Sequence, residues 1–146
     1  MKRGQALVFF ALVIPMALIP VAAYAIDATV LETRAAHLQE VAALAAEEAA
    51  QQVDVTTLRS GGGLVIDPAV AKTVVANAVA TLEPQASVVS VSVSGSQVTV
   101  SLSELSLLPV NLLSRPSVTL EARASARLTA GYDSPSSFLP LPRSTF

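Results

Sequence analysis

The feature that most constrains this chain is an apolar run of 21 residues, Ala6 to Ile26, which no charged residue interrupts. As a helix with a rise of 1.5 Å per residue, the run would extend about 31 Å, close to the thickness of the hydrocarbon core of a bilayer. Pro15 and Pro20 lie inside it, and membrane helices tolerate proline, which can kink them. The sequence therefore predicts a membrane-spanning helix at residues 6–26.

The charges on either side of this run indicate its orientation. Lys2 and Arg3 precede it, whereas all 11 acidic residues follow it. By the positive-inside rule, residues 1–5 are expected in the cytoplasm, and the C-terminal part outside the cytoplasmic membrane. Because acidic residues outnumber basic ones after Ile26, that part lacks the basic surface that nucleic-acid binding requires.

A cleaved signal peptide is the second interpretation of the same residues. Lys2 and Arg3 would form its basic start, Ala6 to Ile19 its apolar centre, and Ala23-Tyr24-Ala25 an A-x-A cleavage pattern. Cleavage after Ala25 would release a secreted or periplasmic binding or adhesion module that begins at Ile26. Both interpretations stay open on these residues alone.

The helical pattern continues beyond the apolar run. Asp27 to Gln52 contains neither Gly nor Pro and is rich in Ala, Glu, Gln and Leu, so one helix of nearly fifty residues is expected, with an extracytoplasmic part within residues 27–59. Apolar residues recur in it at steps of 4 and 3: Leu31, Ala35, Leu38, Ala42, Ala45 and Ala49. Small side chains permit close helix approach. We interpret this stripe as a packing interface with other helices, so Ala42→Leu is expected to weaken assembly without unfolding the rest.

A small α+β head is predicted at residues 60–130. A glycine-rich loop around Gly61-Gly62-Gly63 leads to Asp67-Pro68, an N-cap followed by proline at the first helical position. The helix that starts there should end at about Leu82, before Glu83-Pro84. Its apolar residues spaced four apart are expected on one side: Val70, Val74, Ala78 and Leu82.

Three segments alternate apolar and polar residues, which is the period of a strand with one buried face. They are Ala86–Ser94, Gln97–Leu102 and Ser117–Ala130, with a turn at Ser94-Gly95-Ser96 and an apolar loop at Leu107–Ser114. We expect a three-stranded antiparallel sheet that packs one face on helix and has an exposed edge that could accept a partner strand. Residues 131–146 contain repeated Pro and Ser and are predicted to form a disordered tail.

No catalytic pattern is evident in the sequence. There is no Cys, and His37 is the only His, so a solvated helix residue is the simplest interpretation of it. Glu47 and Glu48 are adjacent and would diverge on a helix, and the glycine run lacks the Lys of a phosphate-binding loop. We therefore expect no enzyme, no cofactor, no metal site and no small-molecule substrate.

The start of the chain resembles the TadE/TadG-like family of the tight-adherence (Flp) pilus system. Arg3-Gly4-Gln5 before the apolar run and Asp27 at its end match that family's pattern. The segments RAAHLQEVAALAAEEAA, from Arg34, and LPVNLLSRPSVTLEARASARL, which ends at Leu128, are similar to its Ala-rich helix and last strand. The resemblance covers Arg3 to about Leu128. It implies a pilin-like, membrane-anchored minor pilin or pilus-assembly component that acts in cell adhesion, with other pilus or assembly subunits as partners.

One position departs from the family pattern. In the TadE branch, a prepilin peptidase is expected to cut between the residues matching Gly4 and Gln5 and to leave a Glu at the fifth mature position. This chain has Phe9 there, and a Phe cannot neutralise the amino terminus of a neighbouring subunit. The resemblance therefore favours the unprocessed, TadG-like branch and a retained helix over cleavage between Ala25 and Ile26.

Overall fold

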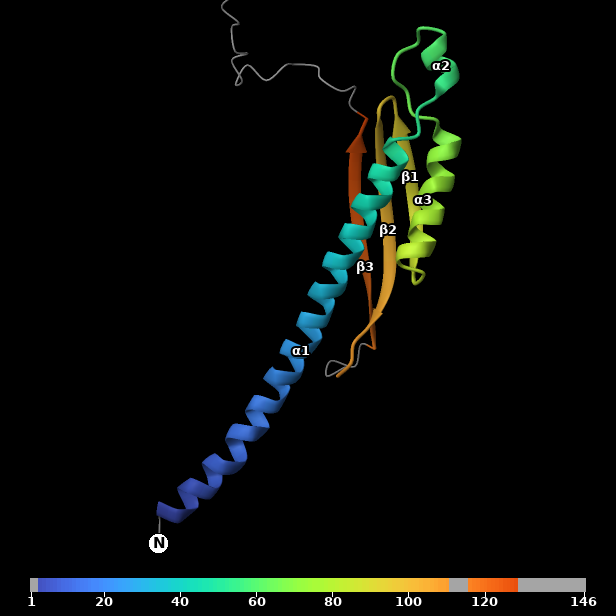
Figure 1. Cartoon of the computed structure of the whole chain (residues 1–146). Helices are drawn as coiled ribbons and strands as arrows, with labels where there is room; N and C mark the ends of the chain where they lie inside the picture. The colour runs from blue at the N-terminus through green and yellow to red at the C-terminus, as the bar shows by residue number, and fades with distance from the viewer. Residues whose placement is uncertain (1–2, 111–115, 129–146) are drawn as a thin grey trace, which may run out of the picture.

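The computed structural model describes residues 3–110 and 116–128, with side chains from Val8 onward. Its elements are three helices followed by three strands: α1 (Arg3–Ala50), α2 (Val55–Arg59), α3 (Pro68–Leu82), β1 (Ala86–Ser94), β2 (Gln97–Leu107) and β3 (Ser117–Arg127). Figure 1 shows the C-terminal part of α1 lying across the sheet, while its N-terminal part extends far beyond it. This α+β arrangement confirms the predicted fold class.

The strands form one antiparallel sheet in the order β1-β2-β3. The β1–β2 hairpin closes at the pair Ser94–Gln97, and Gly95 turns the chain with a φ of 60°, a left-handed conformation that glycine adopts without steric cost. β2 and β3 pair without a register shift from Gln97–Arg127 to Leu107–Ser117. The hairpin and the third strand are therefore confirmed.

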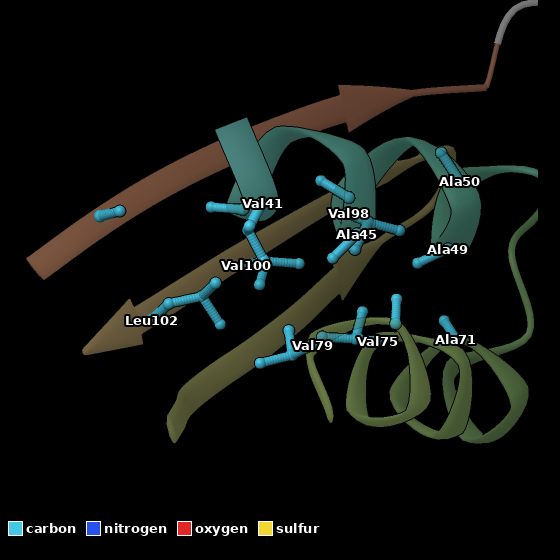
Figure 2. Close-up of a cluster of buried hydrophobic side chains, with 14 of the residues drawn as sticks. Val41, Ala45, Ala49, Ala50, Ala71, Val75, Val79, Val98, Val100 and Leu102 are labelled. Carbon is cyan, nitrogen blue, oxygen red and sulfur yellow. The ribbon is translucent and has the colours of Figure 1, made fainter. Parts of the chain in front are cut away.

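The hydrophobic core lies between one face of this sheet and the two long helices. Val98, Val100 and Leu102 of β2 point toward α1, and Val75 and Val79 of α3 close the other side (Figure 2). The largest fully buried side chains are Leu, Ile and Val. Alanines dominate the contribution of α1, and their small side chains let the helix backbone lie close to the sheet, so a thin core can still be densely packed.

The stripe interpreted as an interface with other subunits needs correction. Leu38, Ala42, Ala45 and Ala49 are fully buried in the head's own core. Only Leu31, which is partly buried, and Ala35, which is exposed, lie outside that cluster. The periodicity did identify a packing face, but the sheet of the same chain covers most of it.

Several boundaries also differ from the sequence predictions. α1 ends at Ala50, and α2 is a separate short helix, so residues 27–59 are not one extracytoplasmic helix apart from the head. β2 runs five residues beyond Leu102, to Leu107, and β3 ends at Arg127. The predicted tail, residues 131–146, and half of the loop predicted at 107–114 lie outside the described residues.

The predicted start of α3 is confirmed, whereas its buried face is not. Asp67 caps the helix by accepting hydrogen bonds from the N–H groups of Ala69 and Val70, and Pro68 follows as the first helical residue. Val70 and Leu82, however, are substantially exposed. The buried stripe shares only Ala78 with the predicted one and consists of Ala71, Val75, Ala78 and Val79.

The connection that carries α2 is closed at its base. Val53 pairs with Ile66, and the N–H of Ile66 donates to the carbonyl of Gly95 in the β1–β2 turn. Hydrogen bonds from the hydroxyl and N–H of Thr57 and the N–H of Thr56 hold the pKa of the Asp54 carboxyl below its ordinary value. Asp54 is the N-cap of α2. Because its pKa is lower in the folded state, the ionised carboxylate stabilises α2 at pH values above the ordinary pKa, and this stabilisation is lost as pH falls through the lowered pKa.

We predict that Ala42→Leu destabilises the head, because three additional carbon atoms must fit into a fully packed site. Overpacking of this kind typically costs about 1–3 kcal/mol. Urea unfolding of the detergent-solubilised chain, followed by circular dichroism, measures the change. Ala35→Leu is the matched control, since it makes the same substitution at an exposed position of the same helix. Equal stability of the two variants would contradict the burial of Ala42.

Candidate functional site

The N-terminal half of α1 presents a large exposed apolar surface. From Val8 to Ile26 every side chain except that of Ala23 is exposed, including Phe9, Phe10 and Met16. Soluble monomers rarely expose a continuous apolar surface of this size. Within the described residues this is the one helix long and apolar enough to cross a membrane, and only 6% of its most apolar window is buried. A buried core helix is thereby excluded, and the segment is suited to be a membrane anchor or a signal sequence.

Both candidate processing positions lie within α1. Gly4 and Gln5 belong to its first turn, and the helix passes without a break through Ala25 and Ile26, which are exposed. Every residue of the core cluster follows Ile26, so cleavage after Ala25 would leave that cluster in one piece. Phe9 is exposed and contacts the ring of Phe10 edge-on, with 6.0 Å between centroids.

Asp27 connects the end of the apolar segment to the head. Its carboxylate accepts a hydrogen bond of 3.0 Å from the backbone N–H of Val110, in the connection that follows β2. Asp27 is 8% exposed, and a buried carboxylate requires such a donor. The residue that the family resemblance places at the end of the membrane segment thus ties α1 to the β2–β3 connection.

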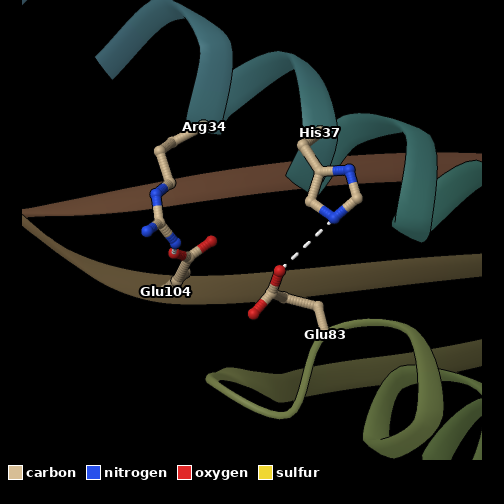
Figure 3. A network of polar contacts seen from close by, with 4 residues as sticks. All are labelled: Arg34, His37, Glu83 and Glu104. Carbon is tan, nitrogen blue, oxygen red and sulfur yellow. Dashed lines mark hydrogen bonds and ion pairs between the residues drawn. The ribbon is translucent and has the colours of Figure 1, made fainter. Parts of the chain in front are cut away.

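A second link joins α1 to the sheet two turns further on. Nη1 of Arg34 lies 3.0 Å from Oε1 of Glu104 on β2, and the Glu104 side chain is 1% exposed against 45% for Arg34 (Figure 3). Glu104 follows Val98, Val100 and Leu102 on the face of β2 that points toward the helices. Among the described residues, neither Oε2 of Glu104 nor Oγ of Ser106 has a hydrogen-bond partner.

Two more contacts complete the junction between helix and head. Nε2 of His37 lies 3.3 Å from Oε2 of Glu83, at the C-terminal end of α3 (Figure 3). Nε2 of Gln39 donates to the carbonyl of Arg123 on β3. His37 is half-exposed, as predicted for a helix surface residue, but its contact with Glu83 was not predicted. The contact becomes an ion pair when the imidazole is protonated.

These contacts fix the rotation and the height of α1 on the head. Asp27, Arg34 and His37 all lie within three turns of helix, and they reach three different elements. Through this junction, the direction of the apolar segment is tied to the orientation of the head. Sequence reasoning missed it because its partners lie tens of residues apart, although the inward alternation of β2 could have placed Glu104 on the covered face.

The described residues show few features of a catalytic or metal-binding site. In residues 3–110 and 116–128, no group of three His, Cys, Asp or Glu side chains lies close enough to hold a metal ion. A hollow of about 340 Å³ lies along α1, beside Thr29, Thr33, Arg34 and His37, and none of these is an activated nucleophile. The expectation that the chain is not an enzyme stays a prediction.

We predict that Arg34→Ala destabilises the folded head, because it leaves the Glu104 carboxylate buried without a cation. Loss of one partner of a buried charge pair is strongly destabilising. Since Arg34 is nearly half-exposed, we expect the lower range of about 1–3 kcal/mol. Adding Glu104→Gln should recover part of the loss, because it removes the uncompensated charge. Urea unfolding of both single variants and the double variant forms a double-mutant cycle, which gives the coupling free energy between the Arg34 and Glu104 side chains.

The control for this cycle is Arg59→Ala, which removes an exposed arginine from α2. Such surface substitutions usually change stability by no more than about 0.5 kcal/mol. Additive effects of Arg34→Ala and Glu104→Gln, with no recovery in the double variant, would show that the pair does not contribute to the junction.

Comparison of the chain with protein-family models, with curated proteins and with solved structures gave no match.

Proposed function

We propose that this chain is a membrane-anchored minor pilin or pilus-assembly component of a tight-adherence pilus, with its N-terminus in the cytoplasm and its head outside. The observation that carries the proposal is the construction of α1. One continuous helix of 48 residues supplies an exposed apolar half of membrane length and an Ala-rich half that forms part of the head's core. Such a protein acts by packing and positioning, without a substrate.

The rigid junction favours a retained anchor over a signal peptide. Asp27, Arg34 and His37 hold α1 against the head directly after the apolar segment. A cleaved leader needs no fixed orientation relative to the mature domain, whereas a subunit that must be positioned by its membrane helix does. The match of Arg3-Gly4-Gln5 and Asp27 to the TadE/TadG-like pattern supports the same conclusion.

Two surfaces are open for contacts with other subunits. The apolar half of α1 can pack laterally against other membrane helices, and Leu31 and Ala35 extend that surface along the part of α1 that lies beside the base of the head. β3 is an edge strand of 11 residues, and an unpaired edge can accept a partner strand. Phe9, in place of the family's Glu, favours a TadG-like role in which the chain keeps its N-terminus.

The second candidate function is a secreted or periplasmic binding or adhesion module. It is favoured by the pattern Ala23-Tyr24-Ala25 and by the core cluster, all of which follows Ile26. A chain cut after Ala25 would keep both Asp27 and Arg34, and with them the contacts to Val110 and Glu104. The two candidates therefore differ in the fate of residues 1–25.

We predict that the protein from its own host stays in the membrane pellet after carbonate extraction and needs detergent for release. Its intact mass and N-terminal residue should correspond to an uncut chain. An N-terminus at Ile26, with the protein in the soluble fraction, would replace the anchor by the secreted module. An N-terminus at Gln5 would keep the pilin assignment but show prepilin-type processing despite Phe9.

We further predict that a photo-crosslinking amino acid at position 35 captures a pilus subunit of the host, identified by mass spectrometry of the adduct. Ala35 is exposed and belongs to the stripe, beside the base of the head. The same amino acid at position 40 is the control, because five residues turn a helix by about 140° and Glu40 lies on another face. Equal labelling at both positions, or none at position 35, would argue against this helix face as an assembly contact.

A further inference from the structure

The polarity of β2 reverses near its C-terminal end. From Val98 to Leu102, apolar side chains point toward the helices, and Thr99 and Ser101 point away. At Glu104 and Ser106 the covered face becomes polar, while Leu105 and Leu107 on the outer face are 60% and 70% exposed. A strand with one solvated face normally keeps its polar side outward. The reversal therefore places an apolar surface where water would be expected.

This reversed end lies beside the point where α1 leaves its apolar segment. The N–H of Val110 donates to Asp27, the first residue after the apolar run. Arg34, which pairs with Glu104, lies seven residues further along the helix, or about 10 Å higher. β2 is directed back toward the N-terminal half of α1 (Figure 1). Leu107 is three residues beyond Glu104 on this strand and therefore lies about 10 Å lower than Glu104. Leu107 and Val110 therefore lie at about the level of Asp27.

That level coincides with the surface of a bilayer spanned by the apolar run. If residues 6–26 fill the hydrocarbon core, Asp27 lies at its outer boundary, and the headgroup region extends about 5–8 Å above it. The stretch Leu105–Val110, LSLLPV, carries no charge. Its exposed side chains, Leu105, Leu107 and Val110, thus have the composition and the height of a contact with the lipid interface.

We propose that Leu105, Leu107 and Val110 form a second membrane contact, by which the base of the head rests in the headgroup region of the outer leaflet. This inference rests on the proposed anchoring by α1. The lipid is the occupant that the geometry favours, because the patch is continuous with the membrane segment through the Asp27–Val110 hydrogen bond. Two attachment points, the helix and the patch, would set the tilt of the head relative to the membrane.

The absence of cysteine from the chain permits a direct test with single nitroxide labels. We would place the full chain in vesicles of phosphatidylethanolamine and phosphatidylglycerol, labelled in turn through Leu107→Cys, Thr99→Cys or Met16→Cys. Power saturation measures the collision of each label with oxygen, which partitions into lipid, and with a water-soluble nickel complex. Thr99 lies on the outer face of the same strand, eight residues or about 27 Å further from the membrane, and Met16 reports insertion of α1.

The expected result is a shift toward oxygen at position 107 relative to position 99, with position 16 more strongly shifted than both. Equal nickel accessibility at positions 107 and 99, while position 16 is in lipid, would overturn the contact and leave the anchor intact. An aqueous label at position 16 would overturn both. Protection of position 107 from both reagents, with spin–spin broadening that disappears on dilution with unlabelled chain, would overturn the lipid contact in favour of a second copy.

Discussion

The close packing of an alanine-rich helix on a small sheet is the interaction on which the rest of the structure depends. Leu38, Ala42, Ala45 and Ala49 of α1 are fully buried against the sheet, and a three-stranded sheet with one covered face is near the minimum for independent stability. Because these residues belong to the same helix as the apolar segment, the head cannot fold without fixing the direction in which that segment leaves it. Stability of the head and placement of the anchor are thus one property.

The polar contacts of the junction define the position of α1 on the sheet more closely than apolar packing does. Apolar packing is non-directional, so by itself it defines the position of α1 on the sheet less sharply than contacts between specific polar groups do. A hydrogen bond from Val110 to Asp27 and a charge pair between Arg34 and Glu104 have defined partners and geometry. The buried pair need not add much net stability, because desolvation opposes the attraction. We infer that it selects one register of helix on sheet, which the proposed positioning role would require.

Much of the fold could be predicted from the sequence, because it depends on patterns among neighbouring residues. These are the long uninterrupted helix, the Asp67-Pro68 start of α3 and the alternation of the strands. The sequence could not show which segment covers each apolar helix face. Periodicity shows that Ala42 and Ala45 share a face, but not whether the same chain or another covers it. In α3 most residues are apolar, so spacing alone did not single out the buried stripe. The exposed polar residues at steps of four, Thr73, Asn77 and Thr81, mark the opposite side and could have favoured the stripe through Val75. The pairing of Arg34 with Glu104, 70 residues apart, has no local signal at all.

The reversal of polarity along β2 suggests how one strand can serve two environments. Its first half obeys the rule for a soluble sheet, with valines covered and the hydroxyl residues on the other face only partly buried. Its last residues follow the opposite rule, and Arg34 offsets the cost of covering Glu104. Such an inversion would be unfavourable for a domain surrounded by water, because it buries a charge and exposes leucines. It would become favourable if the exposed side faced lipid, and the proposed membrane contact would then link the ion pair of the junction to the lipid interface.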